Sequence, residues 1–286
     1  MQKLFLILCT SFLFAACQKD NDETPPPPPP EPSKTELNVA YGTDPKQTYD
    51  AYLPAGRKTT TTKVIIYIHG GGWSGGDKTE MTPYVDTLKK RMPDWAVFNI
   101  NYRLATGAPN LFPTQEMDVK KAIEFIYSKR SEYGISDKFV LLGASAGGHL
   151  SCLYAYKYNT PVKIKAVVDF FGPTDLVDMF NNPANFLVPF QLMSVTGGTP
   201  TSVPTIYAEA NPLNYITAQS PPTIILHGGV DIVVLPSQSV LLKNKLSSFG
   251  VTNQYVFYPS ENHGWGGATM TDSFDKISAF LNANVN

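Results

Sequence analysis

Cysteine is scarce in this 286-residue chain, which carries only Cys9, Cys17 and Cys152. Cys9 falls in an apolar N-terminal segment and Cys17 directly follows that segment, so Cys152 is the one cysteine left for a folded domain. A disulfide within that domain is therefore excluded. We expect Cys152 to pack inside a helix rather than to act as a reactive thiol.

Charge and cofactor motifs are also sparse. The formal net charge is −1, which excludes a strongly basic nucleic-acid-binding surface as the main feature of the chain. No His/Cys cluster has metal-ligand spacing, and neither a Gly-x-Gly-x-x-Gly nor a P-loop pattern occurs. We therefore expect no metal, no cofactor and no nucleic-acid partner.

A long hydrophobic run is missing too, because the apolar stretch from Leu4 to Ala16 is too short to span a membrane. Lys3 before it and small residues at its end predict a signal peptide over residues 1–16. The cysteine at the cleavage position resembles a bacterial lipobox, which would make Cys17 the lipidated first residue of the mature chain. An ordinary cleaved signal with an incidental cysteine is the alternative.

Residues 17–35 have the composition of a linker. The residues after Cys17 are mostly acidic, similar to the export tag of lipoproteins displayed on some Gram-negative cells. Six consecutive prolines, Pro25 to Pro30, favour a stiff polyproline II rod. We expect an extracytoplasmic domain, lipid-anchored to the bacterial outer membrane and facing either the periplasm or the cell surface.

The remaining residues, 36–286, are enough for one large core. Strands are predicted at 37–41, 49–53, 64–68, 96–101, 138–142, 164–170, 223–227 and 254–258, the first two as edge strands. Helical patterns lie between the strands, and the clearest covers 114–133. This alternation predicts an α/β fold with a mostly parallel eight-stranded sheet flanked by helices on both faces.

The most informative motif is Gly-Ala-Ser-Ala-Gly at residues 143–147, directly after the predicted strand 138–142. A strand that turns sharply into a helix exposes the middle residue, here Ser145, and directs backbone N–H groups at whatever this side chain attacks. The pattern is typical of an acyl-transfer nucleophile. Because short patterns of this kind also occur by chance, the supporting residues decide.

A glycine loop, His-Gly-Gly-Gly-Trp at 69–73, follows the predicted strand 64–68. Glycine lets a backbone approach a ligand closely. We expect the N–H groups of Gly71 and Gly72, together with that of Ala146 after the nucleophile, to form an oxyanion hole. A flexible turn is the alternative interpretation of the glycines.

The general base must be one of four histidines. We expect His69 to brace the glycine loop, His149 to pack in the helix after the nucleophile, and His227 to cap the loop after its strand. His263 lies in the loop after strand 254–258. Loops after parallel strands gather at the sheet edge that carries the nucleophile, so His263 is the candidate base.

The acid that orients the base is expected between the serine and the histidine in sequence. Asp231, in the loop after strand 223–227, is the preferred candidate, and Asp175, after strand 164–170, is the runner-up. The alternative role for Asp231 is that of a turn residue.

These motifs resemble those of α/β-hydrolase carboxylesterases of the hormone-sensitive-lipase-like and bacterial feruloyl/acetyl-esterase-like (BD-FAE-like) kind. The matching segments, in family order, are 69–73, 76–78, 101–104, 143–149, 171–176, 227–231 and 263–265. The resemblance implies the α/β-hydrolase fold and a Ser145, Asp231, His263 triad. Kynurenine formamidase-like enzymes carry a similar glycine loop, and they cut an amide.

One segment, residues 176–222, is long for a connection between strands and mixes apolar residues with prolines and glycines. We expect this insertion to cover the active site, with Phe186 and Phe190 influencing substrate preference. The alternative is that its aromatic side chains only complete the core.

Together the motifs predict a serine esterase that hydrolyses a small ester or an acylated carbohydrate, removing acetyl or feruloyl groups through an acyl-enzyme. Display outside the cell favours a large carbohydrate substrate. The alternatives are an amidase, formamidase or peptidase of the same fold, and a catalytically silent surface binding module. A complete set of triad and oxyanion residues argues against the silent module.

Overall fold

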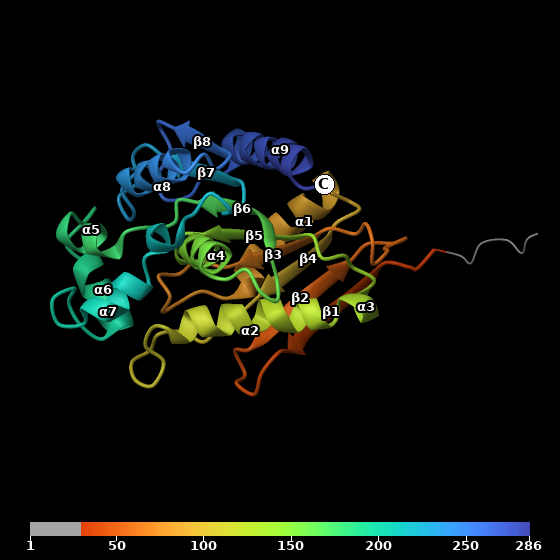
Figure 1. Ribbon diagram of the computed structural model, residues 1–286, viewed down its shortest axis with the longest axis horizontal. Coiled ribbons are helices and arrows are strands. Elements are labelled where there is room, and N and C mark those ends of the chain that lie inside the picture. Colours follow the sequence, from red (N-terminus) through yellow and green to blue (C-terminus); the bar gives the residue numbers. More distant parts are fainter. Residues whose placement is uncertain (1–29) are drawn as a thin grey trace, which may run out of the picture.

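The computed structural model describes residues 30–286, so the expected signal peptide and Cys17 lie outside the described residues. Within that range eight strands form one sheet in the order β1-β2-β4-β3-β5-β6-β7-β8 (Figure 1). Their bounds are β1 (Lys34–Ala40), β2 (Thr48–Leu53), β3 (Val64–Ile68), β4 (Ala96–Ile100), β5 (Phe139–Ala144), β6 (Ile164–Phe170), β7 (Thr223–Gly228) and β8 (Asn253–Tyr258). β2 runs antiparallel to β1 and β4, and the other neighbours are parallel, which confirms the predicted fold class.

Helices cover both faces of this sheet. Their bounds are η1 (Lys78–Met81), α1 (Thr82–Arg91), α2 (Thr114–Ser128), α3 (Arg130–Tyr133), α4 (Ala146–Lys157), α5 (Leu176–Asn181), α6 (Val188–Thr196), α7 (Pro204–Glu209), η2 (Pro212–Tyr215), α8 (Ser237–Ser248) and α9 (Gly267–Asn284). Ile66 of β3 belongs to a core shared with α2, α4 and α8, whereas its neighbour Ile65 belongs to a second core with α1 and α9. This alternation follows from the two-residue period of a strand.

Two strand expectations need correction. β1 covers Lys34–Ala40 where the sequence predicted a strand at 37–41, so it begins three residues earlier than expected. β2 is not an edge strand, because it lies between β1 and β4, and its Tyr49 and Ala51 are fully buried. A short strand with mixed polarity gives no sign of how many neighbours it will have, since its partners come from distant parts of the chain.

The helix predicted over 114–133 is interrupted at Lys129, where α2 ends and α3 begins. The Ser128 hydroxyl donates to the Phe125 carbonyl at 2.7 Å. The Lys129 N–H is shared between the carbonyls of Phe125 and Ile126. These contacts tighten the last turn of α2 and end it early.

The insertion at 176–222 forms a group of short helices, of which α5, α6 and α7 lie together at one end of the molecule (Figure 1). α6 starts with a proline in its first turn and ends at Gly197, whose φ of 84° permits the left-handed cap. Within residues 30–286, no helix combines the length and the hydrophobicity needed to cross a bilayer.

Candidate active site

Ser145 lies at the turn between β5 and α4, with φ 55° and ψ −122°, values that non-glycine residues rarely adopt. Its N–H donates to the Phe170 carbonyl on β6 at 2.8 Å, which holds the turn in place. At Gly147 a Cβ would lie 2.1 Å from the Ile68 carbonyl oxygen, so α4 can begin this close to β3 only with glycine there. The predicted strand–turn–helix context of the serine is therefore present.

The structure brings Ser145, His263 and Asp231 together from three loops at the carboxyl edge of the sheet. His263 Nε2 lies 2.9 Å from Ser145 Oγ, and His263 Nδ1 lies 2.8 Å from Asp231 Oδ2. The ring of Phe171 packs against the His263 imidazole with centroids 4.6 Å apart. The arrangement links hydroxyl, imidazole and carboxylate by two hydrogen bonds.

The Asp231 carboxylate is fixed on all sides. Its Oδ1 accepts from the N–H groups of Val233 and Val234 at 2.8 and 2.9 Å, and Oδ2 also lies 3.2 Å from His227 Nε2. Burial alone would raise the pKa of Asp231, but hydrogen bonds from His227, His263 and the Val234 N–H outweigh it and hold the pKa well below its usual range. The carboxylate is therefore negatively charged at neutral pH.

Asp175, the runner-up for the acid, has a different role. Its side chain caps α5 by accepting hydrogen bonds from the N–H groups of Val177 and Asp178, both at 3.0 Å. This is the local capping chemistry that Asp favours at a helix start. Asp231 is the acid that the structure places against His263.

The glycine loop lies beside Ser145. Gly71 and Gly72 have φ of 102° and 55°, which a residue with a Cβ rarely adopts. Among residues 30–286, no acceptor is found for the N–H groups of Gly71, Gly72 or Ala146. Backbone donors left unused next to a nucleophile are available to a ligand.

The other histidines have structural contacts. His69 Nδ1 lies 2.7 Å from the Gly70 carbonyl, and its ring stacks on Tyr102. His149 Nδ1 accepts from Trp73 Nε1 at 3.1 Å and His149 Nε2 donates to the Ala210 carbonyl at 2.7 Å. Burial lowers the pKa of both rings to about 4, so each is neutral at pH 7.

His227 caps the loop that carries Asp231, since its Nδ1 lies 2.7 Å from Ser239 Oγ and its Nε2 lies 2.9 Å from the Val234 carbonyl. The three histidines thus lie where the sequence predicted. Cys152, in α4, is fully buried, and it is the one cysteine among residues 30–286.

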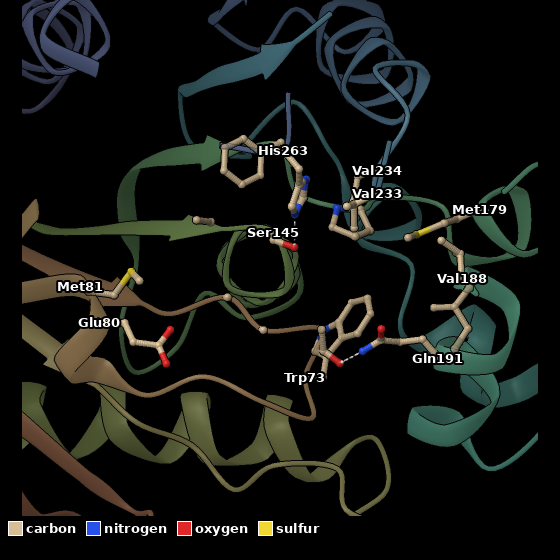
Figure 2. Close-up of a pocket in the computed structure, with 17 residues that line it drawn as sticks. Trp73, Glu80, Met81, Ser145, Met179, Val188, Gln191, Val233, Val234 and His263 are labelled. Carbon is tan, nitrogen blue, oxygen red and sulfur yellow. Dashed lines mark hydrogen bonds between the residues drawn. The ribbon is translucent and has the colours of Figure 1, made fainter. Parts of the chain in front are cut away.

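A cavity of about 380 Å³ opens over Ser145. Figure 2 shows Met179, Val188 and Gln191 of the insertion on one side of the serine and Glu80 and Met81 on the other. Within this lining the ionisable side chains are Glu80 and His263. α5 and α6 of the insertion thus supply part of the cavity wall.

Phe186 and Phe190 do not line the cavity and are 76% and 65% exposed, so an influence on substrate preference would have to act from outside the cavity. The alternative, that these two side chains complete the core, is wrong because both are exposed. α6 directs Val188 and Leu192 inward, and at about 100° per residue Phe190 must then face outward.

Sequence reasoning missed Gln191. Its Nε2 donates to the Gly72 carbonyl at 2.9 Å and to Ser74 Oγ at 3.2 Å, which ties α6 to the glycine loop (Figure 2). Its position could have been inferred from its spacing to Val188, because residues three apart lie on the same face of a helix and Val188 also lines the cavity.

A second cavity of about 200 Å³ adjoins the first and shares Met81, Ala144, Phe171 and His263 with it. Its remaining walls are mostly aromatic, formed by Tyr67, Tyr84, Phe170, Trp265 and Phe274 together with Gly264 and Met270. Nowhere in residues 30–286 do three or more His, Cys, Asp or Glu side chains converge in a way that could hold a metal ion.

The chain has the α/β-hydrolase fold, with Ser145 at the nucleophile elbow between β5 and α4. Comparison with known proteins identifies its family. Residues 49–246 match the BD-FAE family model, so the chain belongs to this family. The predicted resemblance to α/β-hydrolase esterases of the BD-FAE kind is thereby confirmed.

Among curated proteins, the chain is 27% identical over 260 residues to "Esterase LipC" of Mycobacterium tuberculosis, covering 85% of this chain and 64% of LipC. It spans between about half and two thirds of the length of the first curated relatives. Among solved structures, "Truncated form of carbohydrate esterase from gut microbiota" is 28% identical with a TM-score of 0.77, covering 88% of this chain and 96% of that one. A second solved structure, "Bifunctional GH43-CE Bacteroides eggerthii", is 26% identical with a TM-score of 0.74, and the match covers 86% of this chain and 38% of that one.

Proposed function

We propose that this chain is a serine carboxylic ester hydrolase. The observation that carries the proposal is the chain of two hydrogen bonds, 2.9 and 2.8 Å long, from Ser145 through His263 to Asp231 beside the cavity. The family match and the esterases among its relatives support the same reaction class.

The proposed reaction proceeds through an acyl-enzyme. His263 Nε2 takes the proton of the Ser145 hydroxyl as Oγ attacks the ester carbonyl, and Asp231 stabilises the imidazolium that forms. The N–H groups of Gly71, Gly72 and Ala146 receive the oxyanion, each contributing on the order of 3 kcal/mol to lowering the barrier. His263 then protonates the leaving alcohol. In the second step His263 takes a proton from water as the water attacks the acyl-enzyme, and it returns that proton to Ser145 Oγ as the acid leaves.

For the substrate we propose acetyl or feruloyl groups on carbohydrate. The resemblance to a solved carbohydrate esterase at 28% identity supports the carbohydrate, and the aromatic walls of the smaller cavity beside His263 support an aromatic acyl group. We further propose that Cys17 carries a lipid anchor that holds the domain outside the cytoplasm, where polysaccharide is accessible.

The test is hydrolysis of p-nitrophenyl esters from acetate to decanoate, and of methyl ferulate, by the chain and its Ser145→Ala variant. We expect Ser145-dependent cleavage of acetate, ferulate or both, with unchanged folding of the variant by circular dichroism. Wild-type rates in the variant would remove Ser145 from the mechanism. Labelling of the serine by a fluorophosphonate without ester cleavage would favour an amide substrate, and no labelling would favour a silent binding module.

A further inference from the structure

A thirty-residue stretch of the insertion, residues 179–208, contains no Asp, Glu, Lys, Arg or His. A chain with 16% charged residues would place about five in a stretch of that length. Residues 232–242, in and after the loop that carries Asp231, are uncharged as well. The Asn185 amide donates to the Ile232 carbonyl at 2.7 Å and joins the two segments into one surface.

This surface exposes large apolar side chains, although surface helices normally present polar residues to water. Phe186, Leu187 and Phe190 are 76%, 59% and 65% exposed, and Ile232 is 62% exposed. Polar but uncharged Asn182, Gln191 and Ser194 are exposed among them. We call Asn185, Phe186, Leu187, Phe190, Met193 and Ile232 the uncharged rim.

The uncharged rim is continuous with the active-site cavity. α6 directs Val188, Gln191 and Leu192 into the cavity while its outer side carries Phe190 and Met193. Val233, next to Ile232, both lines the cavity and is partly exposed. A molecule bound on the rim is therefore positioned to extend toward Ser145.

We propose that the uncharged rim binds the neutral glycan chain that carries the ester, an inference that rests on the proposed function. Contiguous exposed apolar surface of this kind marks an interaction site. Sugar rings offer apolar C–H faces to aromatic side chains and hydroxyl groups to neighbouring amides, and a neutral chain needs no charged partner. Surfaces that lie on anionic membranes carry Lys and Arg, which this one lacks.

The test measures binding of the chain to an unesterified, uronate-free β-1,4-xylan by affinity electrophoresis, with Ser145→Ala in every variant so that catalysis plays no part. We expect Phe186→Ala/Phe190→Ala to weaken binding about tenfold. Ile232→Ser is an independent variant in the adjoining loop and should weaken binding in the same direction. The matched control is Phe249→Ala. Phe249 is an exposed aromatic residue at the end of α8, and because α8 runs back across the sheet, Phe249 lies at the edge opposite the active site.

With Ser145 restored, the double variant should lose kcat/KM on acetylated xylan by the same factor and keep wild-type values on p-nitrophenyl acetate. Equal xylan binding by all variants would overturn the proposal. So would a dimer that the double variant converts to a monomer in ultracentrifugation, or rim-dependent binding to phosphatidylglycerol vesicles in place of xylan. Absence of ester hydrolysis by the wild-type chain would refute the proposed function, whereas the binding result bears on the rim alone.

Discussion

Replacing Gln191 with leucine tests whether the insertion holds the candidate oxyanion loop in position. Leucine has nearly the same volume as glutamine, so it keeps the packing of α6 and removes only the hydrogen bonds from Nε2 to the Gly72 carbonyl and Ser74 Oγ. Gly72 has a positive φ and no acceptor is found for its N–H within residues 30–286. The contact to its carbonyl therefore restrains the peptide unit that directly follows the one carrying this donor.

The expected size of the effect follows from these contacts. Gln191 is exposed, and a hydrogen bond in such a position contributes about 0.5–1.5 kcal/mol net. The donors bind the oxyanion only as the oxyanion forms, so loss of this restraint raises the activation barrier of the chemical step. We therefore expect kcat to fall about 2- to 10-fold. KM should stay near the wild-type value, because the substrate carbonyl gains its strongest contact only in the transition state.

Steady-state kinetics with p-nitrophenyl acetate measures both parameters. Ser74→Ala is the control, because it removes the 3.2 Å contact and leaves the 2.9 Å bond to the Gly72 carbonyl, so its kcat should lie between the wild type and Gln191→Leu. An unchanged kcat with raised KM in Gln191→Leu would show that Gln191 only contacts substrate, and the positioning argument would then be refuted.

Two further predictions concern buried carboxylates. Asp231→Asn keeps an oxygen for the Val233 and Val234 N–H groups but cannot accept from His263 Nδ1, so kcat should fall about 10⁴-fold while the melting temperature changes little; a loss below tenfold would contradict the assigned role. Asp169 is fully buried, and burial raises its pKa from 3.8 to about 7 against an opposing hydrogen bond from the Gly172 N–H. Because the unfolded chain releases this proton at lower pH than the folded protein does, the stability that the group contributes is complete below pH 3.8 and is lost as pH rises toward 7. Urea titrations measure the free energy of unfolding of both proteins. Between pH 4 and pH 8 that of the wild type should fall by on the order of 4 kcal/mol relative to that of Asp169→Asn. The same pH dependence of the unfolding free energy in both proteins would disprove the assignment.

The central strands and the nucleophile turn could be predicted because their signals are local. β3, β5 and β6 are short apolar runs, and the glycines around Ser145 are required by backbone contacts such as the one between Gly147 and the Ile68 carbonyl. The position of β2 inside the sheet depends on pairing with β4, and no local pattern encodes that register.

The remaining site residues depend on features that only the folded chain specifies. Asp175 and Asp231 both accept hydrogen bonds from backbone N–H groups two and three residues on, so their sequences look alike, and only the loop position puts Asp231 beside His263. The outward orientation of Phe190 follows from which residue begins α6, and helix starts are the least determined part of a sequence pattern.

The buried His149 has a consequence for exchanging parts between related proteins. Its two ring nitrogens join Trp73 in the glycine loop to the Ala210 carbonyl at the end of α7, across α4. A chimaera that replaces residues 179–208 leaves this bridge in place, whereas one that also changes the backbone path at residue 210 moves the carbonyl away from a histidine with no access to water. Transplants of substrate-binding segments from relatives should therefore have their second junction before Ala210, because the backbone then keeps the position at which its carbonyl meets His149.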